Sequence, residues 1–423
     1  MTIAIMSVVA LFIAVGISVC LPYNVGLISI FMAFVVGVLI NGMPVAKVLG
    51  NFPISLFFTI LGVTYMFGLA NTNGTVNQLA KSAVGLVGGK RGLVPIAIWI
   101  LSFTIAGIGP GAIPIIALLA PPTMILSSKL KISPFLMAIS VANAAGASAM
   151  SPVTYSGIIA IRIIEGFIPG DVGLQLFLNS ALINIIIYAV AYCLFGGLKL
   201  WGKEDFGEEM ALVTKELSEK VVYTREQKTT LVGMVVLLVG GIVFKYDVGL
   251  LALSIGVVLT LLKCGNEADA IKSMPLNAII MVCGVTILVG LLKETGGMDI
   301  FVKLMASIST TNTVVLVATF IPSIISVYSS TTGVCFPAFL PLIPGLAETL
   351  GANPMALASG MCMGSLLVDT SPLSTNGAIT IAAATPEMDK GKLFNQLLVW
   401  GLSMSVIGAV ASWIIFGILG IAV

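Results

Sequence analysis

The sequence predicts an all-α polytopic membrane protein made of two inverted repeats, each with five transmembrane helices, a re-entrant hairpin and a broken helix. Composition is the first indication: 58% of the 423 residues are hydrophobic, 9% are charged, and the mean hydropathy is +1.13. Soluble chains carry about 25% charged residues. The other two indications are motifs that recur in the second half of the chain, and polar, helix-breaking stretches inside apolar segments.

The membrane crossings are predicted from apolar segments that match the bilayer in length. A hydrocarbon core about 30 Å thick needs about 20 apolar residues of helix. Two of the crossings, residues 133–165 and 354–385, are long and are interrupted by polar residues, so we expect a broken helix in each. The predicted crossings are residues 2–21, 25–41, 53–71, 133–165, 172–196, 230–245, 247–263, 276–292, 354–385 and 394–421.

Two further apolar segments, residues 93–127 and 313–350, predict re-entrant hairpins. Each consists of two short apolar arms joined by a tip that does not favour a helix. The first tip is glycine-rich, Gly107-Ile108-Gly109-Pro110-Gly111, and the second is hydroxyl-rich, Ser329-Ser330-Thr331-Thr332-Gly333. Backbone that leaves the helix at membrane depth is tolerated only against protein or a water-filled cavity.

The two broken helices carry related motifs. Residues 371–377 read Ser-Pro-Leu-Ser-Thr-Asn-Gly, and residues 151–157 read Ser-Pro-Val-Thr-Tyr-Ser-Gly. Discontinuous helices in corresponding positions of two repeats indicate the binding site of a transporter.

Other motifs support the duplication. Gly62-Val63-Thr64 recurs as Gly284-Val285-Thr286, and residues 23–27 recur with one change as residues 246–250. We therefore expect a first repeat over residues 1–196, a charged linker over residues 197–229, and a second repeat over residues 230–423.

Charge distribution predicts the orientation. An odd number of crossings per repeat inverts the second repeat relative to the first. Placing the linker in the cytoplasm puts most Lys and Arg residues inside, as the positive-inside rule requires. We expect a plasma-membrane protein with both termini outside, whose first hairpin enters from the cytoplasm and whose second enters from outside.

The candidate site residues lie at the hairpin tips and helix breaks. Ends of half-helices present N–H groups suited to carboxylates, and free carbonyls and hydroxyls suit a hard cation such as Na⁺. The substrate candidates are Gly109, Pro110, Gly111, Ser151, Thr154, Ser156, Ser330, Thr331, Thr332, Ser374, Thr375 and Asn376. The Na⁺ candidates are Gly107, Ala112, Asn143, Ser151, Ser329, Gly333, Asp369 and Ser371.

Charged residues inside the crossings leave alternatives open. Asp369, at membrane depth, is a cation ligand, a proton carrier or a cap of the half-helix that follows. Arg162 and Glu165 are three residues apart and can pair on one helix face. They mark the end of the fourth crossing, and the alternative for Arg162 is an anion contact.

The sequence also resembles a known family. The runs Pro53–Phe58, Gly62–Phe67 and Asn71–Thr75 are similar to MatC-type malonate and dicarboxylate carriers, relatives of the divalent anion:sodium symporters in the ion transporter superfamily. The resemblance implies a dimerising scaffold domain and a transport domain that moves as an elevator. The symporters carry Ser-Asn-Thr at each hairpin tip, whereas this chain has Ser330-Thr331-Thr332 and Gly109-Pro110-Gly111.

These observations predict a secondary active, Na⁺-coupled carrier of a small dicarboxylate such as malonate, succinate or malate, forming a homodimer and using no cofactor. Coupling to Na⁺ is favoured because a dianion bound without a central Lys needs co-bound cations. The alternative is a cation/proton antiporter, or a permease that needs a solute-binding protein, with Asp369 as proton carrier. The near-neutral charge of +2 gives no indication of a nucleic-acid partner. The absence of histidine and of an intramembrane acidic pair argues against an enzyme.

Overall fold

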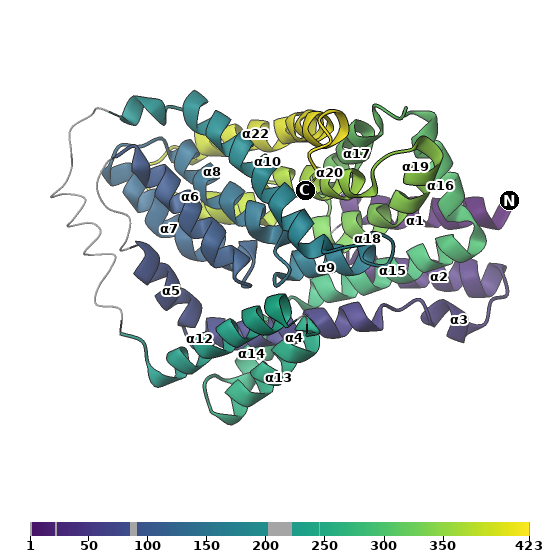
Figure 1. Cartoon of the computed structure of the whole chain (residues 1–423), viewed down its shortest axis with the longest axis horizontal. Coiled ribbons are helices and arrows are strands. Elements are labelled where there is room, and N and C mark those ends of the chain that lie inside the picture. The colour runs from purple at the N-terminus through teal and green to yellow at the C-terminus, as the bar shows by residue number, and fades with distance from the viewer. Residues whose placement is uncertain (1, 22, 85–90, 202–221, 245, 423) are drawn as a thin grey trace.

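The structure is a computed structural model (Figure 1), and it describes residues 2–21, 23–84, 91–201, 222–244 and 246–422. Within these ranges every regular element is a helix. Most of the predicted linker, residues 202–221, lies outside the described residues.

The first half of the chain is a series of apolar helices with short connections. Its fourth predicted crossing is divided into α8, a 3₁₀ turn and α9, with residues 151–154 between the turn and α9. The elements are α1 (Thr2–Cys20), α2 (Val25–Ala33) with its π-helical extension (Phe34–Ile40), α3 (Val45–Leu49), α4 (Ile54–Thr72), α5 (Thr75–Val84), α6 (Leu93–Gly107), α7 (Ala112–Lys129), α8 (Pro134–Ala147), the 3₁₀ turn (Ser148–Met150), α9 (Tyr155–Ile164), α10 (Val172–Leu194) and a 3₁₀ turn (Leu198–Leu200).

The second half follows the same order. Its broken helix is divided into α20, a 3₁₀ turn and α21, with residues 371–374 before α21. The elements are α12 (Arg225–Leu238) with a π-helical extension (Val239–Val243), α13 (Val248–Leu261), α14 (Glu267–Ser273), α15 (Leu276–Thr295), α16 (Gly297–Ser307), α17 (Val314–Tyr328), a π-helical turn (Thr331–Cys335), α18 (Phe336–Phe339), a 3₁₀ turn (Leu340–Leu342), α19 (Ile343–Leu350), α20 (Pro354–Leu367), a 3₁₀ turn (Val368–Thr370), α21 (Thr375–Ala382), and α22 (Lys390–Ser412) with a π-helical extension (Trp413–Ile418).

Length and composition confirm a polytopic membrane protein. Seven described segments are long and apolar enough to cross a membrane. In the first broken helix, Pro134–Ile164, 94% of its apolar 18-residue stretch is buried, so protein surrounds that stretch on nearly all sides. The seven segments are Ile54–Thr72, Ala112–Lys129, Pro134–Ile164, Val172–Leu194, Leu276–Thr295, Thr331–Leu350 and Lys390–Ile418.

Among the contacts between the two halves, two helix crossings are formed by glycines. At the crossing of α4 and α13, a Cβ on Gly62 would lie 2.1 Å from the carbonyl oxygen of Gly249. At the crossing of α2 and α15, a Cβ on Gly284 would lie 2.2 Å from the carbonyl oxygen of Gly26. Small residues let membrane helices approach closely. The Gly-Val-Thr motif of each half thus meets the Tyr-x-Val-Gly-Leu motif of the other half.

The two helical hairpins lie on opposite sides of the view in Figure 1. The first, α6 and α7, lies at the left, and the second, α17 with α18 and α19, lies at the right near the N-terminus. α4, α12 and α13 run along the lower edge, and α1, α2 and α15 lie at the right.

Candidate substrate and cation site

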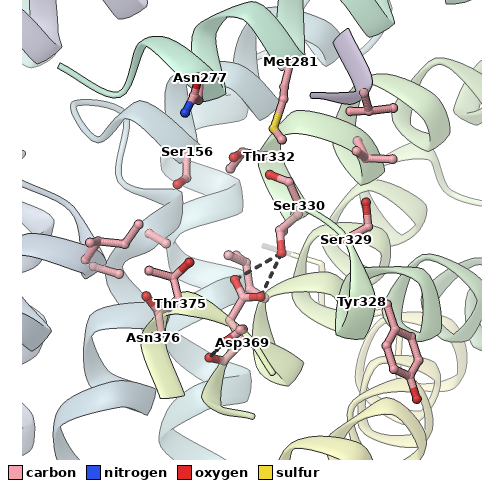
Figure 2. A pocket seen from close by; sticks show the side chains of 18 of the residues that line it. Ser156, Asn277, Met281, Tyr328, Ser329, Ser330, Thr332, Asp369, Thr375 and Asn376 are labelled. Atoms are coloured by element: carbon pink, nitrogen blue, oxygen red, sulfur yellow. Dashed lines mark hydrogen bonds between the residues drawn. The ribbon is translucent and has the colours of Figure 1, made fainter. Parts of the chain in front are cut away.

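A cavity of about 530 Å³ lies where the broken helices and the second hairpin tip meet. Small-molecule pockets typically measure about 300–1,000 Å³. Figure 2 shows Asn277 and Met281 of α15 on one side, with Asp369, Thr375 and Asn376 on the opposite side. The lining residues are Ser18, Tyr23, Asn24, Val25, Ala112, Ile113, Gly146, Ala149, Tyr155, Ser156, Asn277, Met281, Tyr328, Ser329, Ser330, Thr331, Thr332, Val334, Leu366, Asp369, Leu373, Ser374, Thr375 and Asn376.

The polar lining is mostly hydroxyl and amide. Asp369 is the only charged side chain among the described residues that line the cavity. An anionic ligand would therefore meet neutral donors and one carboxylate, with no Lys or Arg among those residues to balance it.

The Asp369 carboxylate belongs to a group of crowded oxygen atoms. The Thr331 hydroxyl oxygen lies 3.0 and 3.1 Å from the two carboxylate oxygens of Asp369 and 3.2 Å from the carbonyl oxygen of Ser365. The Ser326 hydroxyl lies 2.5 Å from Thr331 Oγ1 and 2.9 Å from the same carbonyl. Each hydroxyl carries one hydrogen. Two hydrogens cannot serve five short oxygen–oxygen contacts, so this group (hereafter the oxygen cluster) is suited to a cation or an additional proton.

Each of the two helix breaks is stabilised by an equivalent hydrogen bond. Ser374 Oγ donates to the carbonyl oxygen of Asp369, and Thr154 Oγ1, its counterpart in the first half, donates to the carbonyl oxygen of Ala149 at 2.6 Å. The fold-back is tight: a Cβ on Gly157 would lie 2.0 Å from the Ser151 carbonyl oxygen, and Gly377 has the equivalent close approach. These contacts explain why Ser or Thr and Gly recur at fixed positions in both motifs.

Two helices begin at the cavity without a side-chain cap. α21 starts at Thr375, and the preceding Ser374 makes no capping hydrogen bond because its hydroxyl donates backwards into the break. α7 starts at Ala112 after Gly111, which has no side chain to offer. The first N–H groups of a helix have no intrahelical partner and carry a partial positive charge. Since α7 and α21 pack together, both positive ends lie at the same cavity.

The predicted candidates that the structure brings to this cavity come mainly from the second half. The second break ends at Ser374 and is therefore shorter than the motif at residues 371–377. Thr375 and Asn376 thus line the cavity from the first turn of α21. From the first half, only Ala112 and Ser156 of the predicted residues reach it. The full set is Ala112, Ser156, Ser329, Ser330, Thr331, Thr332, Asp369, Ser374, Thr375 and Asn376.

Several predicted residues do not line the cavity because their polar groups are used elsewhere. Ser151 donates to the carbonyl oxygen of Gly107 at 2.7 Å, which ties the first break to the first hairpin tip. Thr154 caps α9 through the N–H of Gly157, and Ser371 is fully buried and accepts the N–H of Leu373 at 3.3 Å.

Asn143 and Gly333, predicted as Na⁺ ligands, also do not line the cavity. Asn143 Oδ1 accepts from Trp99 Nε1 at 2.9 Å, and its Nδ2 donates to Asn184 at 2.8 Å, so its amide holds three helices together. Gly333 lies in the π-helical turn, where its N–H donates to Ser330 Oγ at 3.0 Å.

The first hairpin tip faces a second, smaller cavity. Gly109 and Pro110 line a mainly apolar space of about 200 Å³ beside α4. Gly109 has a φ of +143°, and its missing side chain leaves room for the ring of Phe67. Gly111 lines neither cavity, and Tyr155 lines both.

Sequence reasoning missed the residues that face the second tip from outside the breaks. Tyr155 occupies the position of Thr375 in the repeated motif, which was a usable signal. Asn277 and Met281 lie in the first turns of an apolar crossing that has no polar break, and Tyr23 and Asn24 lie in a short connection. Neither context distinguishes them from ordinary helix-end residues.

A comparison with protein families finds a match in the first part of the chain. Residues 1–149 match the family model described as the N-terminus of the dicarboxylate carrier protein MatC. The resemblance to MatC-type carriers is confirmed over this region. The match indicates a carrier and not an enzyme. A search of curated proteins finds no match to this chain.

Solved transporter structures share the fold. The YdaH transporter of Alcanivorax borkumensis is 14% identical, with 88% of each chain covered and a TM-score of 0.56. MtrF of Neisseria gonorrhoeae, described among a class of antimetabolite efflux pumps, is 12% identical, with 91% of this chain and 84% of that chain covered and a TM-score of 0.58. At these identities the likeness concerns the fold alone.

Proposed function

We propose that this MatC-like chain is a secondary active transporter that carries a small dicarboxylate together with Na⁺. One observation carries the proposal: two uncapped helix N-termini line the same cavity as Asp369 and Thr331, the two residues of the oxygen cluster that reach it. The first feature suits carboxylates, and the second suits a cation.

The substrate class follows from the charge pattern. A dianion in a cavity without basic side chains needs other positive groups to offset its lost hydration. The N-termini of α7 and α21 supply two positive ends, one for each carboxylate of a short diacid. Hydroxyls of Thr332 and Thr375 and the amide of Asn376 add neutral donors in the same cavity. A monocarboxylate would leave one of these ends unused.

The coupling ion follows from the oxygen cluster. Na⁺ is a hard cation, and hydroxyl, carbonyl and carboxylate oxygens are the ligands it prefers. A cation bound at Asp369 would neutralise its carboxylate and so lower the repulsion of the incoming dianion. A proton on Asp369 would do the same, which keeps proton coupling or cation/proton antiport as the second candidate.

The transport cycle is proposed from the duplication. With inverted repeats, an even number of crossings separates the α1–α2 connection from the linker, so both lie on the cytoplasmic side. The cavity, lined by Tyr23 and Asn24 of that connection, then opens to the cytoplasm. We propose that the bundle bearing the breaks and hairpins moves past the α2, α4, α13 and α15 scaffold as an elevator. The homodimer implied by the family resemblance remains part of this proposal.

Uptake by purified protein in proteoliposomes tests the function. Labelled malonate or succinate should accumulate under an inward Na⁺ gradient and should not accumulate without one. Uptake that ignores Na⁺ and follows a pH gradient would replace Na⁺ by H⁺. If neither gradient drives uptake, and unlabelled diacids do not compete, the substrate class is wrong.

Asp369→Asn separates coupling from substrate binding. The amide keeps the shape of the side chain and removes the charge that holds the cation. We expect gradient-driven accumulation to be lost while exchange of labelled for unlabelled dicarboxylate continues. Asp299→Asn, an exposed carboxylate on α16 outside the cavity, is the matched control and should accumulate normally.

A further inference from the structure

We infer that Arg162 is a positioning residue of the transport cycle, because its ion pair with Asp247 holds the side of the site opposite Asn24 closed. The inference rests on the proposed alternating-access function and adds to it the contact that stabilises one state. Arg162 lies in the last turn of α9, the helix that follows the first break, and Asp247 is the N-cap of α13. The pair therefore joins the bundle that carries the site to the α4–α13 crossing.

The Arg162 guanidinium is held from several directions. Its Nη2 donates to Asp247 Oδ2 and lies 3.4 Å from Thr59 Oγ1 on α4, and its Nη1 donates to Glu165 Oε1 at 3.0 Å. The arginine side chain is 24% exposed, compared with 39% for Asp247. A forked, multiply hydrogen-bonded arginine pair is stronger than a simple surface contact.

The acceptor is fixed in place. Asp247 Oδ1 accepts the N–H of Leu250 at 2.9 Å while Oδ2 receives Arg162. Thr59 lies at the glycine crossing, where a Cβ on Gly249 would come within 2.3 Å of the Thr59 Cα. The arginine thus anchors to a rigid part of the helix pair, and displacement of α9 must break the ion pair.

The sequence repeat shows that the contact exists on one side only. The counterpart of Asp247 is Asn24, which is neutral, and the counterpart of Arg162 on α21 is Ala382. Asn24 turns its amide to the carbonyl oxygen of Asn277 at 3.1 Å and caps α2 through the N–H of Gly26. No equivalent charge pair can form between α21 and α2.

The packing of α9 and of α21 also differs between the two sides of the site. α9 packs against α4, whereas α21 packs against α7, α8 and α22 and makes no comparable contact with α15, the counterpart of α4, among the described residues. On that side the 530 Å³ cavity separates Asn24 and Asn277 from Thr375 and Asn376. A hollow of about 610 Å³ also lies beside Asp247, but it shares no lining residue with the 530 Å³ cavity. The site is therefore open beside Asn24, and beside Asp247 it is closed off from that hollow by the packing of α9 against α4. In an alternating-access cycle the opposite state requires this closed side to open.

Thiol labelling of a residue behind the ion pair tests the inference directly. Ile158, one turn before Arg162 on α9, is 3% exposed and lies at the hollow beside Asp247. In proteoliposomes, Ile158→Cys should react slowly with a membrane-impermeant maleimide, after subtraction of the labelling of the same protein without the added cysteine. Asp247→Asn removes the charge but retains a capping residue, as Asn24 shows at the equivalent position.

We expect Arg162→Gln and Asp247→Asn each to raise the Ile158→Cys labelling rate about fivefold or more. The double variant should add little to either single change, and Arg162→Lys, which keeps the charge but loses the fork, should raise the rate less than Arg162→Gln. Glu165→Gln is the matched control, because Glu165, the C-cap residue of α9, pairs with Arg162 locally and does not bridge the two parts. Unchanged labelling in Asp247→Asn, or an equal rise in Glu165→Gln, would overturn the inference.

This readout is independent of the cargo. Labelling is measured without substrate, so the proposed dicarboxylate function can fail in the uptake assay while the ion pair is still found to control access. Conversely, normal Na⁺-driven uptake together with unchanged labelling would reject the role of Arg162 and leave the proposed function standing.

Discussion

The glycine crossings make a strong prediction about stability. Replacing Gly62 by Ala places a methyl carbon 2.1 Å from the carbonyl oxygen of Gly249, whereas ordinary C–H···O contacts lie at about 3.3–3.6 Å. The helices α4 and α13 must therefore separate by more than about 1 Å. Overpacking typically costs about 1–3 kcal/mol. Because the clash is with backbone, which cannot change rotamer, we expect the upper end of that range.

The assay is thermal unfolding of purified variants in one detergent. Since about 1 kcal/mol shifts the Tm of a 150–250-residue domain by about 2–4 °C, Gly62→Ala should lower the Tm by several degrees. Gly284→Ala, with its 2.2 Å approach to Gly26, should have the same effect. Gly16→Ala on α1 is the control, because no atom lies within 4 Å of its added Cβ. Equal Tm values for all three variants would refute the account of the duplicated motifs.

Two further predictions concern the cavity. Thr331→Val removes the hydroxyl beside Asp369 at nearly constant volume. Since a hydrogen bond to a charged group contributes about 1.5–3 kcal/mol, the Na⁺ concentration for half-maximal uptake should rise about tenfold or more. An unchanged value would exclude Thr331 from the cation site. Thr375→Ala and Asn376→Ala should reduce dicarboxylate uptake while membrane insertion stays normal, and uptake like that of the unmodified protein in both would remove the start of α21 from the site.

The helices were largely predictable because apolar segments of bilayer length have few alternatives in lipid. The polar motifs also gave the positions of both breaks, since Ser151–Thr154 and Ser371–Ser374 leave the α-helix. The short helices α3 and α14 were missed, because five and seven residues at a crossing's end carry no usable periodicity. The domain boundaries and the inverted repeat remain predictions.

The site was less predictable because the sequence does not show which way a polar side chain turns. Asn143 and Ser151 are residue types that can act as ligands, but in the structure they form other hydrogen bonds. Asn143 bonds to Trp99 and Asn184, and Ser151 bonds to the Gly107 carbonyl. The pairing of Arg162 with Asp247 joins residues far apart in the chain, whereas the nearby Glu165 was the only partner that spacing could indicate. Long-range geometry of this kind needs the folded structure.

The central claim is that a dicarboxylate and a cation occupy one cavity and stabilise each other. Equilibrium binding of labelled succinate to the purified protein, measured across a series of Na⁺ concentrations, tests this most directly. Linkage requires that Na⁺ raise the succinate affinity by the same factor by which succinate raises the Na⁺ affinity. We predict equal factors above one in the unmodified protein and a factor near one in Asp369→Asn. Succinate binding that is independent of Na⁺ and of pH, or absent altogether, would contradict the account.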